Sequence, residues 1–281
     1  MKIERTAAAV QQQVKAWRKE GLSVGLVPTM GYLHEGHKSL IDRAVKENDR
    51  VVVSDFVNPI QFGPKEDLAT YPRDLEADSR LCEAAGADIL FAPEPSEMYA
   101  EDFSTRVLIE DVSAELCGKS RPGHFSGVGT VVSKLFHIAM PDRAYFGQKD
   151  AQQLAVIRRM VRDLNFPLEI VGCPIIREAD GLAKSSRNTY LSAEERKAAL
   201  VLSRSIRLAE EMLQSGEQDG EKILDAMKQL ISSEPLAKID YVEMVSWDAI
   251  KVHHQVDGPV LIAIAVYIGK TRLIDNTIFE G

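Results

Sequence analysis

The stretch Val24-Gly25-Leu26-Val27-Pro28-Thr29-Met30-Gly31-Tyr32-Leu33-His34-Glu35-Gly36-His37 decides the fold of this chain. Its first four residues predict a strand, and the amphipathic residues 39–47 predict a helix. A strand, a glycine-containing turn and a helix start make a site for phosphate, because the first helical turn leaves N–H groups unpaired and carries partial positive charge. His34 and His37, three residues apart, can point at one anion, and Gly36 lets a ligand approach the backbone closely. We therefore expect a nucleotide triphosphate to bind here.

The histidine pair also has two simpler interpretations. The zinc-binding helix motif needs its histidines four residues apart with Glu beside the first, whereas here the spacing is three. Cys82, Cys117 and Cys173 are scattered and form no Cys-x-x-Cys pair, so the sequence predicts no metal ligands. A structural, hydrogen-bonded histidine pair is a stronger alternative than a metal site. Nucleotide binding remains the favoured interpretation.

Composition excludes several classes of function. With 45% apolar and 27% charged residues, the chain can bury a core and is not disordered. A net charge of −8 disfavours binding to nucleic acid or to an anionic membrane. The longest apolar run, residues 259–268, is too short to span a bilayer. The first residues lack an apolar signal core and the cysteines fit a reducing compartment, so we expect a cytoplasmic protein.

Strand and helix patterns alternate along the first part of the chain. Expected strands cover residues 22–27, 51–57, 89–92, 144–146 and 168–171, and expected helices cover residues 7–17, 39–47, 75–85, 131–139 and 152–163. This alternation implies an α/β fold, a Rossmann-like doubly wound parallel sheet with helices on both faces. The ligand site of such a sheet lies at the carboxyl ends of its strands. Each candidate motif comes just after a strand.

Beyond about residue 176 the pattern changes. Residues 192–195 form a capping box ahead of a long helix that is expected to reach Gln214. A second helix and three strands follow, at residues 221–232, 240–245, 260–268 and 271–274, with a tight turn at Gly269-Lys270. We therefore expect two domains: a Rossmann-like domain over residues 1–175 and a second, smaller α+β domain over residues 176–281.

Several short blocks in order carry a family resemblance. They are HEGH at residues 34–37, FVNPIQFG at 56–63, YPR at 71–73, RPGHF at 121–125, FGQKD at 146–150 and KSSRN at 184–188. The first resembles the His-x-Gly-His signature of nucleotidyltransferases and class I aminoacyl-tRNA synthetases. The ordered set, from near residue 20 to Asn276, resembles the pantothenate synthetase (pantoate–β-alanine ligase) family.

The resemblance implies a reaction. A carboxylate must be activated before it can form an amide, and attack on the α-phosphate of ATP makes an acyl adenylate and expels pyrophosphate. The family condenses pantoate with β-alanine in this way, through pantoyl adenylate, to give pantothenate, AMP and pyrophosphate, with Mg²⁺ accompanying ATP. Protein catalysis of such a step is largely positioning and stabilisation of charge on phosphate oxygens. The resemblance also implies a homodimer, formed through the first domain.

The resemblance assigns residues to this chemistry. The catalytic residues that it implies are His34, His37, Lys149 and Lys184, with His37 as proton donor. The implied ATP-binding residues are Met30, Gly31, Tyr32, Leu33, His34, Glu35, Gly36, His37, Gly147, Gln148, Lys149, Asp150, Ile176, Lys184, Ser185, Ser186 and Arg187. The implied residues for pantoate and β-alanine are Gln61, Gln153, Asn58, Tyr71 and Arg121. Residues 1–175 would thus bind nucleotide and pantoate, and residues 176–281 would carry the Lys-Ser-Ser-Arg loop.

Plainer interpretations stay open for some of these residues. Residues 184–187 could be a solvated polar turn instead of a mobile basic loop that closes on the triphosphate. Lys149 and Asp150 could form a surface ion pair instead of contacting phosphate and ribose. An amide suits the hydroxyls and carboxylate of pantoate, yet a glutamine on a helix surface is an alternative, and it is stronger for Gln152 than for Gln153.

Two further alternatives concern the whole protein and one loop. The loop at residues 121–124 could simply cap the helix that follows it. An adenylyl- or cytidylyltransferase would use the same histidine motif with another acceptor, and a nucleotide-sensing module would bind ATP without turnover. Exchange of pyrophosphate into ATP distinguishes the three functions. The ligase requires pantoate alone for exchange, the transferase requires a different acceptor, and the sensor shows no exchange.

Overall fold

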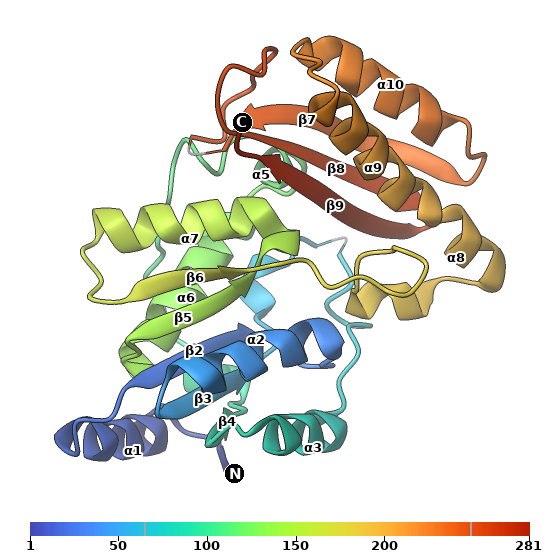
Figure 1. Ribbon diagram of the computed structural model, residues 1–281. Coiled ribbons are helices and arrows are strands. Elements are labelled where there is room, and N and C mark those ends of the chain that lie inside the picture. The colour runs from blue at the N-terminus through green and yellow to red at the C-terminus, as the bar shows by residue number, and fades with distance from the viewer. Residues whose placement is uncertain (65, 248) are drawn as a thin grey trace. The chain divides into compact units, whose positions relative to one another are not determined.

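The computed structural model describes residues 1–64, 66–247 and 249–281 (Figure 1). Its contacts divide the chain into two compact units. The first unit comprises Met1–Ile109, Pro122–Gln148 and Val156–Pro174, and the second comprises Glu110–Arg121, Lys149–Ala155 and Ile175–Gly281. The sequence places residues 110–121 and 149–155 in the first domain, whereas their contacts place them in the second unit. The two segments contact each other, since Gln152 donates to the Val112 and Glu115 carbonyls, and sequence periodicity does not report such tertiary contacts.

A six-stranded parallel sheet forms the centre of the first unit (Figure 1). Its strands are β1 (Lys2–Glu4), β2 (Val24–Thr29), β3 (Arg50–Asp55), β4 (Ile89–Phe91), β5 (Arg143–Gly147) and β6 (Glu169–Cys173), in the spatial order β1-β4-β3-β2-β5-β6. The chain runs outward from β2 through β3 to β4 and then crosses to β5, so the strand order reverses between β2 and β5. Ligands of doubly wound sheets bind at this reversal, beyond the carboxyl ends of the strands.

Helices cover both faces of this sheet, as the alternating pattern predicts. They are α1 (Ala7–Lys19), α2 (Glu35–Glu47), α3 (Leu75–Ala85), the short α4 (Pro95–Met98), α6 (His124–Ala139) and α7 (Ala151–Asp163). The helices α2 and α3 pack together over a core that includes Ile41, Val53 and Cys82. On the other face α6 contacts α1, and its Ser133 Oγ lies 3.2 Å from Met160 Sδ of α7. Right-handed crossovers require this distribution, and the predicted doubly wound fold is confirmed.

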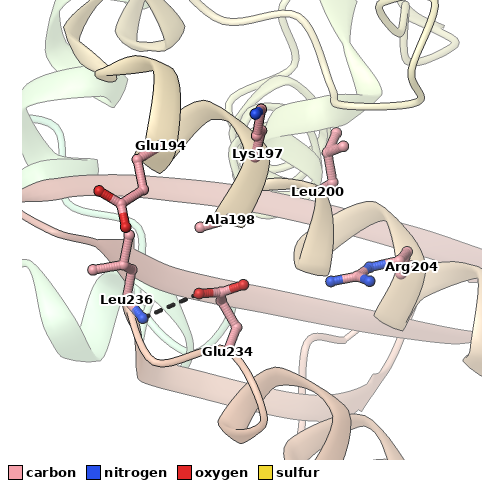
Figure 2. A pocket seen from close by; sticks show the side chains of 7 residues that line it. All are labelled: Glu194, Lys197, Ala198, Leu200, Arg204, Glu234 and Leu236. Atoms are coloured by element: carbon pink, nitrogen blue, oxygen red, sulfur yellow. Dashed lines mark hydrogen bonds between the residues drawn. The ribbon is translucent and has the colours of Figure 1, made fainter.

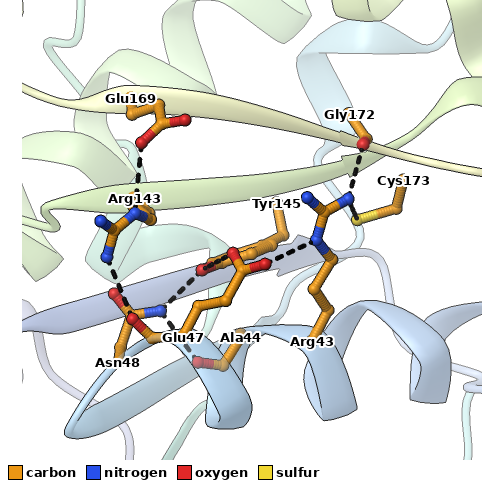
Figure 3. Close-up of polar contacts among 9 residues, drawn as sticks. All are labelled: Arg43, Ala44, Glu47, Asn48, Arg143, Tyr145, Glu169, Gly172 and Cys173. Carbon is orange, nitrogen blue, oxygen red and sulfur yellow. Dashed lines mark hydrogen bonds and ion pairs between the residues drawn. The ribbon is translucent and has the colours of Figure 1, made fainter.

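A polar network fastens α2 to β5 and β6 (Figure 3). Arg43 donates from Nη1 to the Gly172 carbonyl at 3.0 Å and pairs through Nε with Glu47 Oε1 at 2.9 Å. Tyr145 donates to Glu47 Oε2 at 2.9 Å and accepts from Asn48 Nδ2 at 2.7 Å. Burial raises the pKa of Tyr145 to about 12, so the phenol remains a neutral donor. These contacts fix the orientation of α2, the helix that begins at the histidine pair.

The second unit contains a three-stranded antiparallel sheet. Its strands are β7 (Ala237–Ser246), β8 (Val260–Ile268) and β9 (Thr271–Phe279), and its helices are α5 (Cys117–Ser120), α8 (Ala193–Ala198), α9 (Leu200–Gln214) and α10 (Gly220–Ser232). The helices α9 and α10 pack on the sheet through a core that includes Leu202, Met227 and Ile264. The tight turn between β8 and β9 is confirmed, because Ile268 pairs directly with Thr271. The predicted smaller α+β part is therefore present.

The structure corrects several predicted boundaries. The helix α2 begins at Glu35 and not at residue 39, and α6 begins at His124 and not at residue 131. The capping box at Ser192 is confirmed, but the long helix expected after it is divided at Ala199 into α8 and α9. There the Leu202 N–H bonds the Ala199 carbonyl, a tighter turn than that of an α-helix. The short elements β1, α4 and α5 were not predicted, because three or four residues carry no periodicity.

Candidate active site

The chain leaves β2, beside β5, through a turn with two left-handed residues. Gly31 has φ of 79° and Tyr32 has φ of 52°. A Cβ atom at residue 31 would clash with Asp55 Oδ1, so only glycine fits there. The left-handed conformation costs a residue with a side chain roughly 1–2 kcal/mol. Neighbouring contacts must therefore hold Tyr32 in place.

Side chains supply those contacts by accepting hydrogen bonds from the backbone N–H groups of the turn. The Gly31 N–H donates to Thr29 Oγ1 at 3.2 Å. The Tyr32 and Leu33 N–H groups donate to the two carboxylate oxygens of Asp78, each at 2.6 Å. The N–H groups of these three residues therefore already have acceptors inside the protein.

The Asp78 carboxylate also hydrogen-bonds the carboxyl group of Asp55, the last residue of β3. Burial, and next the negative charge of Asp78, raise the pKa of Asp55 to about 7. Burial also raises the pKa of Asp78, although the Leu33 and Tyr32 N–H groups oppose this change. Two adjoining carboxylates in a buried site repel, so Asp55 holds the proton and Asp78 the charge. Neither residue was predicted from the sequence as part of the site.

The histidine pair caps the start of α2. The Gly36 N–H donates to His34 Nδ1 at 3.1 Å, and the His34 N–H donates to His37 Nδ1 at 3.3 Å. The two ring centroids lie 4.1 Å apart. Because both Nδ1 atoms accept, the proton of each neutral imidazole lies on Nε2, the atom through which each ring can donate to an anion. The structure thus brings the two rings together, and the structural interpretation of the pair is also correct.

Two predicted substrate residues, Asn58 and Gln61, lie at the start and the end of the short helix η1 (Pro59–Gln61), close to the turn after β2. Gln61 Nε2 lies 3.1 Å from Met30 Sδ, and Asn58 Nδ2 donates to Gln61 Oε1 at 2.8 Å. The Tyr99 hydroxyl donates to Asn58 Oδ1 at 2.7 Å, and burial raises its pKa. Tyr99 was not predicted as a site residue from the sequence. Asn58, Gln61 and Met30 therefore form one hydrogen-bonded group.

Three further residues hold Gln61 and its surroundings. His124 Nδ1 lies 3.0 Å from the Gln61 carbonyl oxygen. At Gly127 of α6, a Cβ atom would lie 2.5 Å from the Cα of Gln61, so glycine allows η1 to pack against the helix. Tyr71 is buried, and its ring meets the Phe62 ring edge-on at 6.0 Å. His124 lies within the RPGHF block, which could have identified it.

The remaining predicted residues of the first unit lie at the end of β5. Gly147 is the last residue of that strand, and Gln148 follows it in the short helix η2 (Gln148–Asp150). Since β2 and β5 are paired neighbours, the ends of both strands meet at the reversal of strand order. The structure therefore gathers Gly147 with the residues of the turn after β2 at one edge of the sheet.

In the second unit, Lys149 and Asp150 end the short helix η2, directly before α7. Lys149 Nζ is 3.9 Å from Asp150 Oδ2, so the plain ion-pair interpretation describes their mutual contact. Asn276 of β9 donates from Nδ2 to the Lys149 carbonyl at 2.8 Å and holds the backbone there. Gln153 is half-buried, whereas Gln152 is buried and donates to two backbone carbonyls. The expectation that Gln152 lies on a helix surface is wrong.

The segment that carries Lys184 is folded back on itself. The Lys184 N–H donates to the Ile176 carbonyl at 2.9 Å. Arg177 binds both carboxylate oxygens of Asp275 at 2.7 and 3.0 Å, and the Asp275 side chain is 1% exposed. A buried, bidentate pair of this kind positions the segment between residues 176 and 184. Arg177 and Asp275 were not predicted as site residues.

The Lys-Ser-Ser-Arg segment runs into a short helix, η3 (Ser186–Tyr190). Ser185 caps it, because its Oγ accepts the Arg187 N–H at 3.3 Å. Asn188 donates to the Ala183 carbonyl at 3.1 Å and closes the base of the segment. These bonds form a capped polar turn in which Ser186 is buried, so the turn is not fully solvated as the plainer interpretation has it. Nucleotide binding by Lys184, Ser185, Ser186 and Arg187 stays a prediction.

Arg121 and a cavity remain to be placed in the second unit. Arg121 follows the last residue of α5, and its N–H donates to the Cys117 carbonyl at 2.8 Å; the N-cap residue of α6 is Gly123, which has no side chain to cap the helix. A cavity of about 410 Å³ in the second unit involves none of the predicted residues (Figure 2). It is lined by Glu194, Lys197, Ala198, Leu200, Arg204, Glu234 and Leu236.

Two features are absent from the described part of the chain. No three His, Cys, Asp or Glu side chains within residues 1–64, 66–247 and 249–281 gather in a way that suits a metal ion. None of the helices in those same ranges has the length and apolar character that crossing a bilayer requires.

Comparisons with known proteins agree with this geometry. A family model described as pantoate-beta-alanine ligase matches residues 2–278. Pantothenate synthetase from Clostridium acetobutylicum is 64% identical over 276 residues, 98% of each chain. The enzyme of that name from Enterococcus faecalis is 60% identical over 280 residues, which cover 100% of this chain and 99% of the relative.

Solved structures are similar over nearly the whole chain. The crystal structure of pantothenate synthetase from Thermus thermophilus has a TM-score of 0.93 and 47% identity, covering 99% of each chain. The pantoate-beta-alanine ligase from Francisella tularensis, complexed with beta-gamma ATP and beta-alanine, has a TM-score of 0.80 and 34% identity, covering 99% of this chain and 97% of the other. The chain therefore belongs to the pantoate–β-alanine ligase family.

Proposed function

We propose that this protein condenses pantoate with β-alanine at the expense of ATP, through pantoyl adenylate, and releases pantothenate, AMP and pyrophosphate. The observation that carries the proposal is the histidine pair where the strand order reverses. Each ring caps α2 through Nδ1 and offers a proton on Nε2, so two donors are preorganised beside a glycine turn. Preorganised donors that meet developing charge on phosphate oxygens are an effective source of rate. The complex of the Francisella relative with an ATP compound and β-alanine supports the same substrates.

The proposed nucleotide residues divide into two sets. In the first unit, His34 and His37 donate to phosphate, and residues 30–36 and 147–148 surround the nucleotide. In the second unit, Lys149 and Lys184 supply positive charge, Asp150 accepts from ribose, and Ile176 and residues 185–187 complete the set. His37 is the proposed proton donor. These roles rest on the family resemblance together with the positions described above.

Mg²⁺ is proposed to accompany ATP. Magnesium in phosphate-transfer enzymes keeps several waters and binds substrate phosphates, and it needs few protein ligands. In this proposal phosphate oxygens and water would hold most of the coordination positions of the ion. When bound, the ion neutralises charge on the triphosphate.

The acid and the amine are proposed to bind through polar side chains. Gln61 and Gln153 would bind pantoate, since an amide can both donate to a carboxylate and accept from a hydroxyl. Gln61 would also face β-alanine. The remaining proposed contacts are Asn58, Tyr71 and Arg121. Asn58 also orients Gln61, because its Nδ2 donates to Gln61 Oε1 at 2.8 Å.

Three properties of the whole protein belong to the same proposal. We propose that the protein is a homodimer that associates through residues 1–175, and that it works in the cytoplasm. The net charge of −8 supports small-molecule substrates and disfavours nucleic acid and anionic membranes as partners. Residues 1–175 and 176–281 remain the proposed functional domains.

The test is exchange of labelled pyrophosphate into ATP. With pantoate, and without β-alanine, the protein should catalyse exchange, and adding β-alanine should then produce pantothenate and AMP. Exchange that needs a different acceptor would favour a nucleotidyltransferase. ATP binding without exchange would favour a sensor. Either result would overturn the proposal, whereas exchange that depends on pantoate alone would support the adenylate intermediate.

A further inference from the structure

The turn after β2 is held by an acidic side chain that does not belong to the turn. Asp78 lies in α3, is 2% exposed, and accepts the Tyr32 and Leu33 N–H groups at 2.6 Å each. These successive N–H groups follow two left-handed residues, Gly31 and Tyr32, and converge on one carboxylate. Such converging N–H groups form a concave anion-binding arrangement, and here the anion is supplied by the protein. Without it the turn would lose the contacts that compensate its strained conformation.

Asp55 completes this arrangement from the other side. Its carboxyl group hydrogen-bonds Asp78, and Asp55 Oδ1 fills the space where a side chain on residue 31 would lie. Asp78 already accepts two N–H groups, so the bond between the two acids requires Asp55 to be the donor and hence to be protonated. A neutral Asp55 therefore packs against the turn and binds the carboxylate that holds it.

We propose that Asp78 and Asp55 are positioning residues for ATP binding, with the Asp78 carboxylate holding residues 31–33 and neutral Asp55 holding Asp78. This inference rests on the proposed function. Neither residue need touch ATP. Their effect passes through the turn to His34, which follows Leu33 directly and caps α2 with its ring.

The charged and titratable groups around the pair agree with one proton shared between two acids. Asp78 faces Asp55 directly, while Asp74 at the start of α3 adds negative charge near Asp78. Arg5 is the cation that acts on Asp55, and it opposes the rise in its pKa without cancelling it. Cys82 of α3 is buried beside both acids; burial first, and their charge next, raise its pKa to about 12, so the thiol stays neutral.

Ionisation of Asp55 should therefore weaken the turn. The pKa of Asp55 is raised to about 7, so its proton is present below that pH and lost above it. Loss of the proton turns the hydrogen bond between the acids into a repulsion between two buried charges. If only the neutral form supports the turn, about one molecule in ten is competent near pH 8, and the apparent Kd for ATP rises about tenfold from its value near pH 6.

The experiment compares ATP binding by calorimetry near pH 6 and near pH 8 in the wild type, Asp55→Asn and Asp42→Asn. The amide of Asp55→Asn donates to Asp78 at both pH values, so the pH-dependent loss should shrink from about tenfold to about twofold. Titration of ATP and of the histidines is common to all three proteins and cancels in the comparison. Asp42 is an exposed residue of α2 that pairs with Lys38, so its variant should keep the wild-type pH dependence.

A second variant tests Asp78 itself. Asp78→Asn keeps one acceptor oxygen but presents an amide N–H₂ group to the other backbone N–H, so ATP affinity should fall about tenfold or more at both pH values. Equal pH dependence in the wild type and Asp55→Asn would overturn the inference. Wild-type protein that binds ATP with the expected pH profile, yet joins no pantoate to β-alanine, would instead count against the proposed function.

Discussion

A substitution at Gly127 offers the sharpest test of how Gln61 positions pantoate. At this residue of α6 a Cβ atom would lie 2.5 Å from the Ile60 carbonyl oxygen and 2.5 Å from the Cα of Gln61. Both contacts are with backbone, which cannot swing aside as a flexible side chain can. We therefore expect Gly127→Ala to push η1 away from α6 and to move the Gln61 side chain.

The size of the effect follows from the contact distances. Ordinary van der Waals contact between carbon atoms needs about 3.5 Å or more, so η1 must move by about 1 Å. Overpacking of this kind costs about 1–3 kcal/mol, and the better helix propensity of alanine offsets about 1 kcal/mol of it. The fold should therefore survive. A displacement of about 1 Å in a substrate-positioning residue can lower rate up to about 10²-fold.

The assay measures KM for pantoate and for ATP in the complete reaction. We expect Gly127→Ala to raise KM for pantoate about tenfold or more and to change KM for ATP by less than about threefold. Gly63→Ala is the matched control, because its Cβ would meet only the Glu66 side chain, at 3.7 Å. Equal pantoate KM values in the wild type and a folded Gly127→Ala variant would refute the role assigned to Gln61.

Other substitutions separate the remaining roles. His37→Ala should lower the rate of adenylate formation about 10²-fold in a folded protein, and normal turnover would remove His37 from the mechanism. His34→Asn should keep α2 capped, because asparagine is a good N-cap, but should weaken ATP binding in calorimetry, whereas unchanged binding would make the ring purely structural. Asp275→Asn leaves Arg177 without its bidentate partner and should lower the free energy of unfolding by about 3 kcal/mol, with faster proteolysis between residues 176 and 188; unchanged stability would contradict this account. Lys184→Ala should slow the reaction from ATP much more than the reaction from synthetic pantoyl adenylate, because pyrophosphate has left by the second step. Single-turnover kinetics would show equal slowing of both steps if the segment were only structural.

Periodicity predicted the larger elements well, and the reason is burial. Strands such as β3 are covered on both faces and read as apolar runs, and helices such as α3 keep their apolar spacing up to the left-handed Gly86. The helix α6 shows where this evidence ends. Its first turns, from His124 to Thr130, contain two glycines and few bulky apolar residues, yet they are almost wholly buried. Gly127 there reflects the close approach of η1, which is a tertiary contact and leaves no periodic signal.

Residues proposed to touch ligands were easier to identify from the sequence than the residues that hold them in place. Asn58 and Gln61 stand in a recognisable block, and the structure places them in one hydrogen-bonded group with Met30. Asp78 lies in a helix whose sequence reads as an ordinary amphipathic segment, so nothing local distinguishes it from a surface acid. Its role depends on the distance to Tyr32 and Leu33, which are more than forty residues away along the chain.

The histidine pair explains why the predicted start of α2 was wrong. A helix start is usually read from Ser, Thr, Asp or Asn at the cap, and none of these stands before Glu35, so the sequence favours a start near Ser39. In the structure His34 is the N-cap residue, and its backbone N–H donates to His37 Nδ1. The structural and functional interpretations of the pair are therefore compatible, because they use different nitrogens. The Nδ1 atoms are engaged with the backbone, which sets both ring orientations and leaves the proton of each ring on the atom that a phosphate would meet.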